Sequence, residues 1–262
     1  MRIIDIINAV ETFCPLVLQE SYDNAGLQIS SDTNAEVCGV LLCLDVTENV
    51  VREAVEKHCN LILAHHPLLF SPKKRITTDD YVGRTIIEAV KHDITIYAAH
   101  TNLDNAKGGV NYKMAEKMGL ENLHFLSPSQ DGNSGSGLVG ELKTPMAREE
   151  FLAMLKTTFK AEGVRYNDAR KDVIRSVAIC GGAGAFLAGD AVREHADAFV
   201  TGEIGYHRFF GMENDILLVE LGHYETEQYT VEILRDLVRS VDEKVVICYT
   251  ETNPVRYQIN SK

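Results

Sequence analysis

Short apolar runs alternate with segments of helical periodicity through much of the chain. Apolar runs of strand length occupy residues 37–45, 60–64 and 94–98, and amphipathic segments at 48–58 and 79–91 lie between them. Strands that alternate with helices in this way are typical of an α/β protein with a mainly parallel sheet covered by helices. The first half of the sequence therefore predicts one α/β lobe.

A Ser-, Gly- and Asn-rich segment at residues 127–139 interrupts this pattern and is typical of a linker or an exposed loop. Beyond it the alternation resumes, and we predict two similar lobes: residues 1–126 with 228–262, and residues 127–227. The further elements we expect are strands at 174–180, 197–201, 215–221 and 244–250, and helices at 147–159, 185–195 and 224–240.

Composition narrows the class of protein. Hydrophobic residues make up 45% of the 262 residues, so a sizeable buried core is expected. The 26 basic and 38 acidic residues give a net charge of −12, which repels phosphate backbones and argues against nucleic-acid binding. The sequence shows no secretory signal, no apolar stretch of membrane-spanning length and no Cys-x-x-Cys pair. We therefore expect a cytoplasmic protein without a membrane span or a cysteine-based zinc site.

Residue types that bind metals gather directly after the predicted strands. In open α/β sheets, ligand sites form outside the carboxyl ends of the strands, so side chains at these positions can meet. Four of the nine histidines follow strands in this way, together with three acidic residues and a fifth histidine. They are His65, His66, His100, Asp104, Glu203, His207, His223 and Glu227.

The spacing of five of these residues favours a pair of metal ions. His223 and Glu227 lie four residues apart at the start of a predicted helix and can share one face. His65 and His66 are adjacent, so in extended backbone their side chains diverge and can reach two neighbouring ions. Asp104 and Glu227 can bridge two cations. We therefore predict two divalent ions per chain, and this ligand set suits zinc, iron, manganese, nickel or cobalt.

Each motif by itself also has a simpler interpretation. An adjacent histidine pair, an ordinary helix start at 223–227 and a capped turn at 100–104 are all common. For Glu203 and His207 we favour a supporting or surface role, and we interpret the GGAG sequence at 181–184 as a tight turn because it lacks the Walker lysine of a phosphate loop. The remaining histidines are expected to be solvent-exposed: His58, His92, His124 and His195.

Seven segments of the chain resemble the GTP cyclohydrolase I type 2 family, also called the NIF-three-like dinuclear-metal proteins. The resemblance implies metal ligands at His65, His66, Asp104, His223 and Glu227, in a cleft between two similar α/β lobes. It also implies a homohexamer built as a trimer of dimers. Family members often carry Trp where this chain has Tyr22. The matching segments are 21–29, 61–70, 96–111, 137–142, 180–186, 198–207 and 220–227.

These observations favour a metal-dependent hydrolase that acts on a nucleotide or a similar small substrate. Two ions at one site can activate a shared water and polarise a carbonyl or phosphoryl oxygen. His100 could act as general acid or base or could orient a ligand. Opening of the GTP purine ring is implied by the resemblance alone. The alternative is a non-catalytic metal-binding, storage or regulatory ring, and a ring that threads DNA is disfavoured by the acidic charge.

Overall fold

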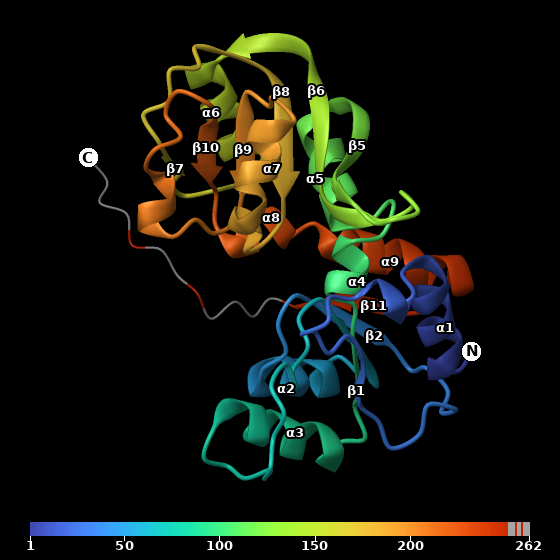
Figure 1. Ribbon diagram of the computed structural model, residues 1–262. Coiled ribbons are helices and arrows are strands. Elements are labelled where there is room, and N and C mark those ends of the chain that lie inside the picture. Colours follow the sequence, from blue (N-terminus) through green and yellow to red (C-terminus); the bar gives the residue numbers. More distant parts are fainter. Residues whose placement is uncertain (251–254, 256–257, 259–262) are drawn as a thin grey trace. The chain divides into compact units, whose positions relative to one another are not determined.

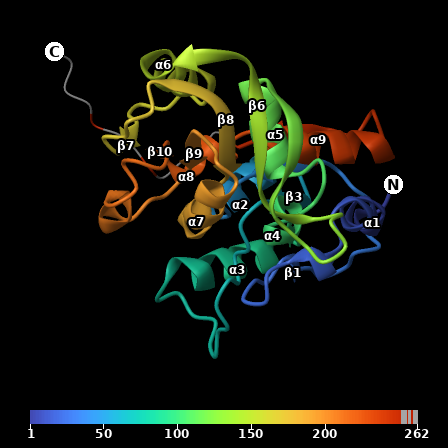
Figure 2. The same ribbon diagram turned by 45° about the horizontal axis from the view of Figure 1, so that its top comes forward.

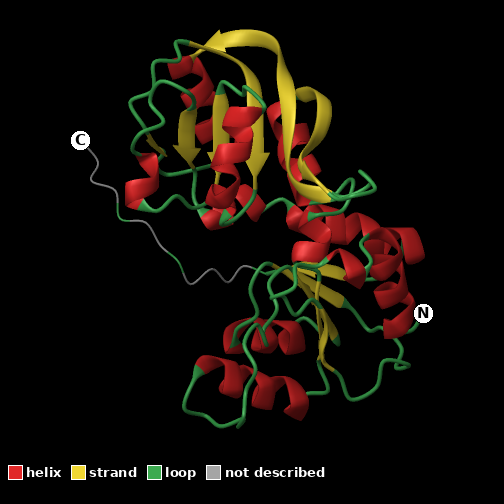
Figure 3. Ribbon diagram, in the orientation of Figure 1, coloured by secondary structure: helices red, strands yellow, loops and turns green. Residues whose placement is uncertain are grey.

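The computed structural model describes residues 1–250, 255 and 258. These residues divide into two units: Met1–Leu103 together with the segment that begins at Thr230 forms the first, and Asp104–Tyr229 forms the second. Each unit contains one β-sheet with helices packed against it (Figure 3). The predicted α/β fold class with two lobes is confirmed.

The sheet of the first unit has the strand order β1-β4-β3-β2-β11. Every neighbouring pair is parallel except β1 with β4. The parallel strands β2, β3 and β4 are buried along their whole length, which explains their uninterrupted apolar sequences. The elements of this unit are α1 (Ile3–Phe13), η1 (Leu16–Leu18), β1 (Gly26–Ile29), β2 (Val40–Cys43), α2 (Glu48–Glu56), β3 (Leu61–Ala64), α3 (Tyr81–Lys91), β4 (Thr95–Ala98), α9 (Thr230–Val241) and β11 (Ile247–Tyr249).

Helices α2 and α3 cover one face of this sheet (Figure 1). Leu41, Ile62 and Ile96, from three adjacent strands, pack there against Val51 of α2 and Ile86 of α3. Helix α2 begins as the sequence predicts, because the Thr47 side chain accepts a hydrogen bond from the backbone of the first turn. The two helices therefore hold the ends of β2, β3 and β4 in fixed register.

The sheet of the second unit has the order β5-β6-β8-β9-β10-β7 and is mixed. Strands β8, β9 and β10 are parallel, whereas β5–β6, β6–β8 and β7–β10 are antiparallel. It thus departs from the mainly parallel sheet that we expected. Its elements, with the connecting helix α4 (Thr101–Asp104), are α5 (Val110–Met118), β5 (Leu120–Pro128), β6 (Gly135–Ala147), α6 (Arg148–Thr158), β7 (Arg165–Tyr166), β8 (Val173–Cys180), η2 (Gly184–Leu187), α7 (Ala188–Arg193), β9 (Ala198–Thr201), η3 (Tyr206–Phe209), β10 (Leu217–Glu220) and α8 (His223–Glu227).

Residues 127–139 are the turn and flanks of the β5–β6 hairpin and not a linker (Figure 2). Ser129 donates its amide to the carbonyl of Ser134, which closes the turn. A Cβ at Gly135 would lie 2.5 Å from the carbonyl oxygen of Ser127, so only glycine fits this strand crossing. Turn chemistry therefore explains the Ser- and Gly-rich composition. Because α5 packs on β5 and β6, the division of the chain falls at Leu103 and Asp104, whereas the sequence analysis places it after residue 126.

The helix expected at 224–240 is two helices, α8 and α9. They are separated at Gln228 and Tyr229, whose side chains donate hydrogen bonds to the carbonyls of Phe159 and Thr158. These bonds fix the break inside the second unit, just before the chain enters the first unit at Thr230. Periodicity alone cannot register such a break, because both pieces are helical.

The second sheet has helices packed on both of its faces. Phe151 and Leu155 of α6 pack with Met114 of α5 on one face, and Ala188 and Ala191 of α7 pack on the other. Figure 1 shows α7 crossing β9 and β8. Across the described part of the chain, no helix is both long enough and apolar enough to cross a bilayer.

Candidate metal centre

Three histidines converge at the carboxyl ends of two adjacent strands of the first unit. His65 and His66 follow β3, and His100 follows β4 by two residues. Because Ala64 and Ala98 are register partners at the ends of these parallel strands, the residues that follow them meet. The ring centroids lie 4.8 Å apart for His65 and His66, and 5.3 and 5.4 Å from each to His100. One ring nitrogen from each lies within 4.8 Å of the others, so the group could hold a metal ion.

The Nδ1 atom of each of these histidines faces a hydrogen-bond acceptor. His65 Nδ1 lies 2.8 Å from the carbonyl oxygen of Ala99, and His66 Nδ1 lies 2.9 Å from Asp45 Oδ1. His100 Nδ1 lies 2.7 Å from Asp23 Oδ1. A carbonyl or carboxylate oxygen can only accept, so Nδ1 must be the donor and the neutral ring carries its lone pair on Nε2. This is the tautomer in which a histidine binds a metal through Nε2.

Asp23 fixes His100 through a buried network. The carboxylate also accepts from the backbone amide of Thr101 at 3.1 Å and from its hydroxyl at 2.5 Å, and its side chain is fully buried. Burial by itself would raise the pKa of Asp23, but the hydrogen bonds from His100 and Thr101 outweigh burial and hold the pKa at about 2. Asp23 is therefore a carboxylate at neutral pH. No spacing rule identifies it, although it lies in one of the segments that carry the family resemblance.

Asp45 is the second carboxylate that sequence reasoning missed. It follows strand β2 by two residues, so the strand-end argument that selects the histidines would also have selected it. A cavity of about 480 Å³ adjoins His66 and Asp45. Its other walls are the start of α2, from Thr47 to Asn49, and the apolar side chains of Leu68 and Tyr81 among others. A small substrate could therefore reach His66 from within the first unit.

His223 and Glu227 meet on one face of α8 in the second unit, as their spacing predicts. His223 Nε2 lies 3.1 Å from Glu227 Oε2, and the carboxylate is 4% exposed. On the other side of the ring, His223 Nδ1 lies 2.8 Å from Glu203 Oε1. With Nδ1 donating to Glu203, a neutral ring would turn its Nε2 lone pair toward a carboxylate. His223 Nε2 and Glu227 Oε2 can lie 3.1 Å apart when a cation or a proton lies between them, so the pair fits a metal site.

The glycine turn at residues 181–184 supports this pair and cannot cradle a phosphate. The amides of Gly181, Gly182 and Gly184 donate to the side chains of Asn111, Thr226 and Thr201. These donors are therefore committed within the protein. Gly182 has φ +59°, and a Cβ there would lie 2.3 Å from Glu227 Oε1 and 3.2 Å from His223 Nε2. The turn is a tight one, as expected, and its missing side chain makes room for His223 and Glu227.

Asp104 and Glu227 lie in the same region of the second unit. Asp104 ends helix α4, and its backbone carbonyl accepts from Asn111 Nδ2 at 3.1 Å. Burial raises the pKa of the Cys180 thiol, and the negative charges of Asp104 and Glu227 raise it further. The structure thus groups His65 and His66 with His100 in the first unit, and it brings His223 and Glu227 together in the second.

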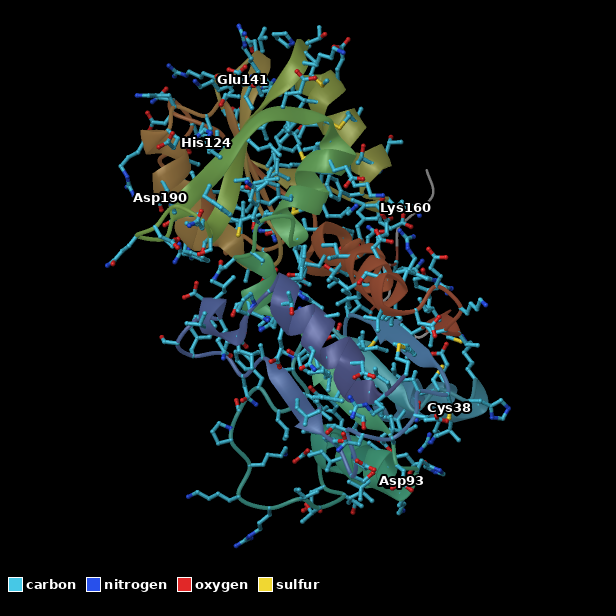
Figure 4. The ribbon with its side chains drawn as sticks, turned by 90° about the vertical axis from the view of Figure 1, so that its right-hand side faces the viewer. Cys38, Asp93, His124, Glu141, Lys160 and Asp190 are labelled. Atoms are coloured by element: carbon cyan, nitrogen blue, oxygen red, sulfur yellow. The ribbon has the colours of Figure 1, made fainter. Side chains whose placement is uncertain are left out.

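The other histidines are placed largely as expected. His58, His92, His124 and His195 are exposed, which confirms their prediction; His124 is labelled in Figure 4. Glu203 supports His223 through its hydrogen bond. His207 lies in η3, with its ring centroid 5.2 Å from that of Tyr206 and 6.2 Å from that of Phe210. It belongs to an exposed aromatic group and has a surface role.

Sequence comparison finds relatives over nearly the whole chain. A Clostridium perfringens protein named GTP cyclohydrolase 1 type 2 homolog is 38% identical over 229 residues, covering 87% of each chain. A protein of the same name from Clostridium acetobutylicum is 33% identical over 237 residues, covering 89% of this chain and 88% of the relative. These matches confirm the resemblance found in the sequence.

Solved structures of related proteins share the fold. The crystal structure of Staphylococcus aureus protein SA1388 superposes with a TM-score of 0.90 at 27% identity, covering 99% of both chains. The model of one protein family, Duf34/NIF3 (NGG1p interacting factor 3), matches residues 1–254. The sequence segments, the fold and these matches agree, and the chain belongs to the Duf34/NIF3 family.

Proposed function

We propose that this protein is a hydrolase that depends on two divalent metal ions and acts on a nucleotide or a similar small substrate. The ligands would be His65, His66, Asp104, His223 and Glu227. The single observation that supports this most is the hydrogen bonding of three histidines. Nδ1 of His65, His66 and His223 each faces an oxygen acceptor of the protein, which leaves Nε2 as the atom that can bind a metal.

The donor set suits transition metals. Three imidazoles and two carboxylates fit zinc, iron, manganese, nickel or cobalt better than calcium or magnesium. When bound, two such ions would polarise a carbonyl or phosphoryl oxygen of the substrate and lower the pKa of a water molecule. The protein contributes the fixed orientation of the three imidazole ligands, because Ala99, Asp45 and Glu203 accept hydrogen bonds from their Nδ1 atoms.

His100 is the residue we assign to catalysis. Its Nδ1 proton is held by Asp23, so Nε2 is the atom that takes a proton from the substrate or returns one. The ring stands beside His65 and His66 and its side chain is 16% exposed, which leaves part of the imidazole accessible. The ionised Asp23 carboxylate accepts the Nδ1 proton and so fixes the tautomer and orientation of the ring.

The relatives' shared name directs the proposal toward nucleotides, because they are called GTP cyclohydrolase 1 type 2 homologs. The net charge of −12 opposes long-range attraction of a nucleotide, and bound cations would offset this repulsion at the metal centre. The cavity beside His66 has the size of a small-molecule site.

The experiment combines metal content with turnover. Elemental analysis of untreated protein should find about two transition metals per chain. Metal-loaded wild type, His223→Ala and His100→Ala are then compared on GTP, phosphoesters and amides, with the exposed His195→Ala as matched control. We expect His223→Ala to lose metal and His100→Ala to lose turnover with its metal retained. Metal-loaded wild type that turns over none of these substrates would favour the non-catalytic storage or regulatory role.

Two further properties belong to the same proposal. None of the six cysteines, all of which lie within the described residues, forms a disulfide, which supports a reducing cytoplasm. A homohexamer follows from the family resemblance and is tested by light scattering coupled to gel filtration, where about six times the 29.1 kDa chain mass is expected.

A further inference from the structure

The second unit carries an aromatic pocket that the candidate metal ligands do not use. A cavity of about 350 Å³ is lined by two short segments, one from β7 and one from η3 and the residue after it. We call it the aromatic pocket, and its lining residues are Val164, Arg165, Tyr166, Tyr206, Phe209 and Phe210.

The aromatic side chains of this pocket are unusually exposed. Tyr206 is 66% exposed, Phe210 is 56% exposed and Tyr166 is 48% exposed. Tyr206 and Phe210 meet edge to face with centroids 5.2 Å apart. Large apolar side chains gathered in one exposed patch mark a binding surface more often than chance. Their flat faces suit a planar ring, because stacking on aromatic side chains tolerates any π-face.

Among the described residues, the lining of the aromatic pocket contains no acidic residue, whereas the chain as a whole is acidic. An anionic ligand is therefore less disfavoured at this pocket than over the rest of the surface. Its one ionisable side chain besides tyrosine is Arg165, whereas the whole chain carries −12. The guanidinium lies over the ring of Phe209, 5.2 Å from its centroid. It is also paired with Glu220 at 2.8 Å, which holds the guanidinium at the pocket, where it can extend the stacking surface. A peptide strand fits less well, because the edge strand β7 has only two residues to pair with.

The pocket is linked to the candidate metal ligands by hydrogen bonds within the second unit. Glu220, at the end of β10, accepts from the backbone amide of Ile204 at 2.7 Å while its other oxygen holds Arg165. Ile204 follows Glu203, whose carboxylate holds His223. A ligand in the pocket would therefore rest on the same loop that orients His223. The larger cavity beside His66 is lined by Asp45 and Glu48, so the aromatic pocket has the less acidic lining of the two.

From these observations we infer that the aromatic pocket binds the planar purine base of a nucleotide. The inference rests on the proposed function only in taking a nucleotide as ligand. Stacking of the base on Tyr206 or Phe210, with the other ring at its edge, requires no metal, so binding should persist in metal-free protein. The proposed centre and this pocket can therefore be tested separately.

The test is equilibrium binding of GTP to full-length, EDTA-treated protein, with tripolyphosphate as a probe that has no ring. Tyr206→Ala and Phe210→Ala should each weaken GTP binding about tenfold or more, and tripolyphosphate should not compete with GTP for the pocket. The matched control is Phe186→Ala, which removes an aromatic side chain that is 58% exposed and lies outside the pocket. Because all three side chains are exposed, the variants should keep the wild-type melting temperature.

Three results would overturn the inference: undetectable GTP binding at millimolar concentration, equal binding by wild type and both pocket variants, or a loss caused only by Tyr81→Ala in the cavity beside His66. Protein that lacks bound metal or turnover yet loses GTP binding in the pocket variants would contradict the proposed function and support the pocket. Metal-dependent turnover, together with GTP binding that is unchanged in the pocket variants, would support the proposed function and contradict the pocket.

Discussion

His100 Nδ1 lies 2.7 Å from Asp23 Oδ1, and these residues are joined across 77 positions of sequence. Asp23 lies just before β1 and His100 just after β4, and these strands are antiparallel neighbours. The sheet therefore carries the carboxylate to the ring that it holds.

Replacing Asp23 with asparagine should reduce turnover about 10- to 100-fold while the metal content stays at the wild-type value. Asparagine can still accept a hydrogen bond from His100, but it lacks the negative charge that strengthens this bond and holds the ring in place. Turnover and elemental analysis on the same preparation check this. Wild-type turnover in Asp23→Asn would show that the pair has no catalytic role.

The low pKa of Asp23 also predicts a pH dependence of stability. Its pKa is about 2 in the fold and about 3.9 in an unfolded chain, so the ionised form is favoured by folding. The stabilisation is complete above about pH 4 and is lost as pH falls toward 2. In urea titrations of metal-free protein, the stability difference between wild type and Asp23→Asn should be smaller at about pH 3 than at about pH 5. A difference that grows toward low pH would contradict this assignment.

Asp45→Asn should weaken metal binding about 10- to 100-fold, because it removes the charge behind His66. Competition with a chromogenic chelator measures the change. Asp93→Asn is the matched control, since Asp93 is exposed at the end of α3 in the same unit (Figure 4). Equal affinities in the two variants would remove His66 from the ligand set.

Gly182→Ala should lose both stability and metal. Alanine at this left-handed position costs about 1–2 kcal/mol in backbone strain, and its Cβ would also collide with Glu227. Gly132→Ala is the matched control, because Gly132 has φ +71° but no atom within 4 Å of an added Cβ. Thermal unfolding and metal analysis should show strain alone in Gly132→Ala. Identical behaviour of the two variants would mean that the turn does not shape the site.

Cysteine reactivity should follow burial. Cys43 and Cys180 are buried with thiol pKa values raised well above the ordinary range, whereas Cys38 is exposed (Figure 4). Iodoacetamide should therefore label Cys38 in native protein about tenfold or more faster than either buried thiol. Mass spectrometry of digested samples measures the rates, and labelling in denaturant is the control. Early modification of Cys180 would contradict its burial.

The sequence by itself determined the α/β class, most strand and helix positions, and the eight polar residues after the strands. These follow from local rules: apolar runs buried on both faces become parallel strands, and the ends of such strands gather at one edge. The pairing of His223 with Glu227 also followed, because four residues span one helical turn.

Only the tertiary structure decided which acceptor holds the Nδ1 atom of each imidazole. Asp23 is 77 positions from the ring that it holds, so no local pattern could select it from 38 acidic residues. The strand-end pattern selected Glu203, but it could not show that its partner is His223. Packing also decided that residues 127–139 form a hairpin and that the helix expected at 224–240 is broken at Gln228. In both places the local sequence correctly indicated a turn or a helix. Long-range contacts decided which strands the turn connects and where the helix is interrupted.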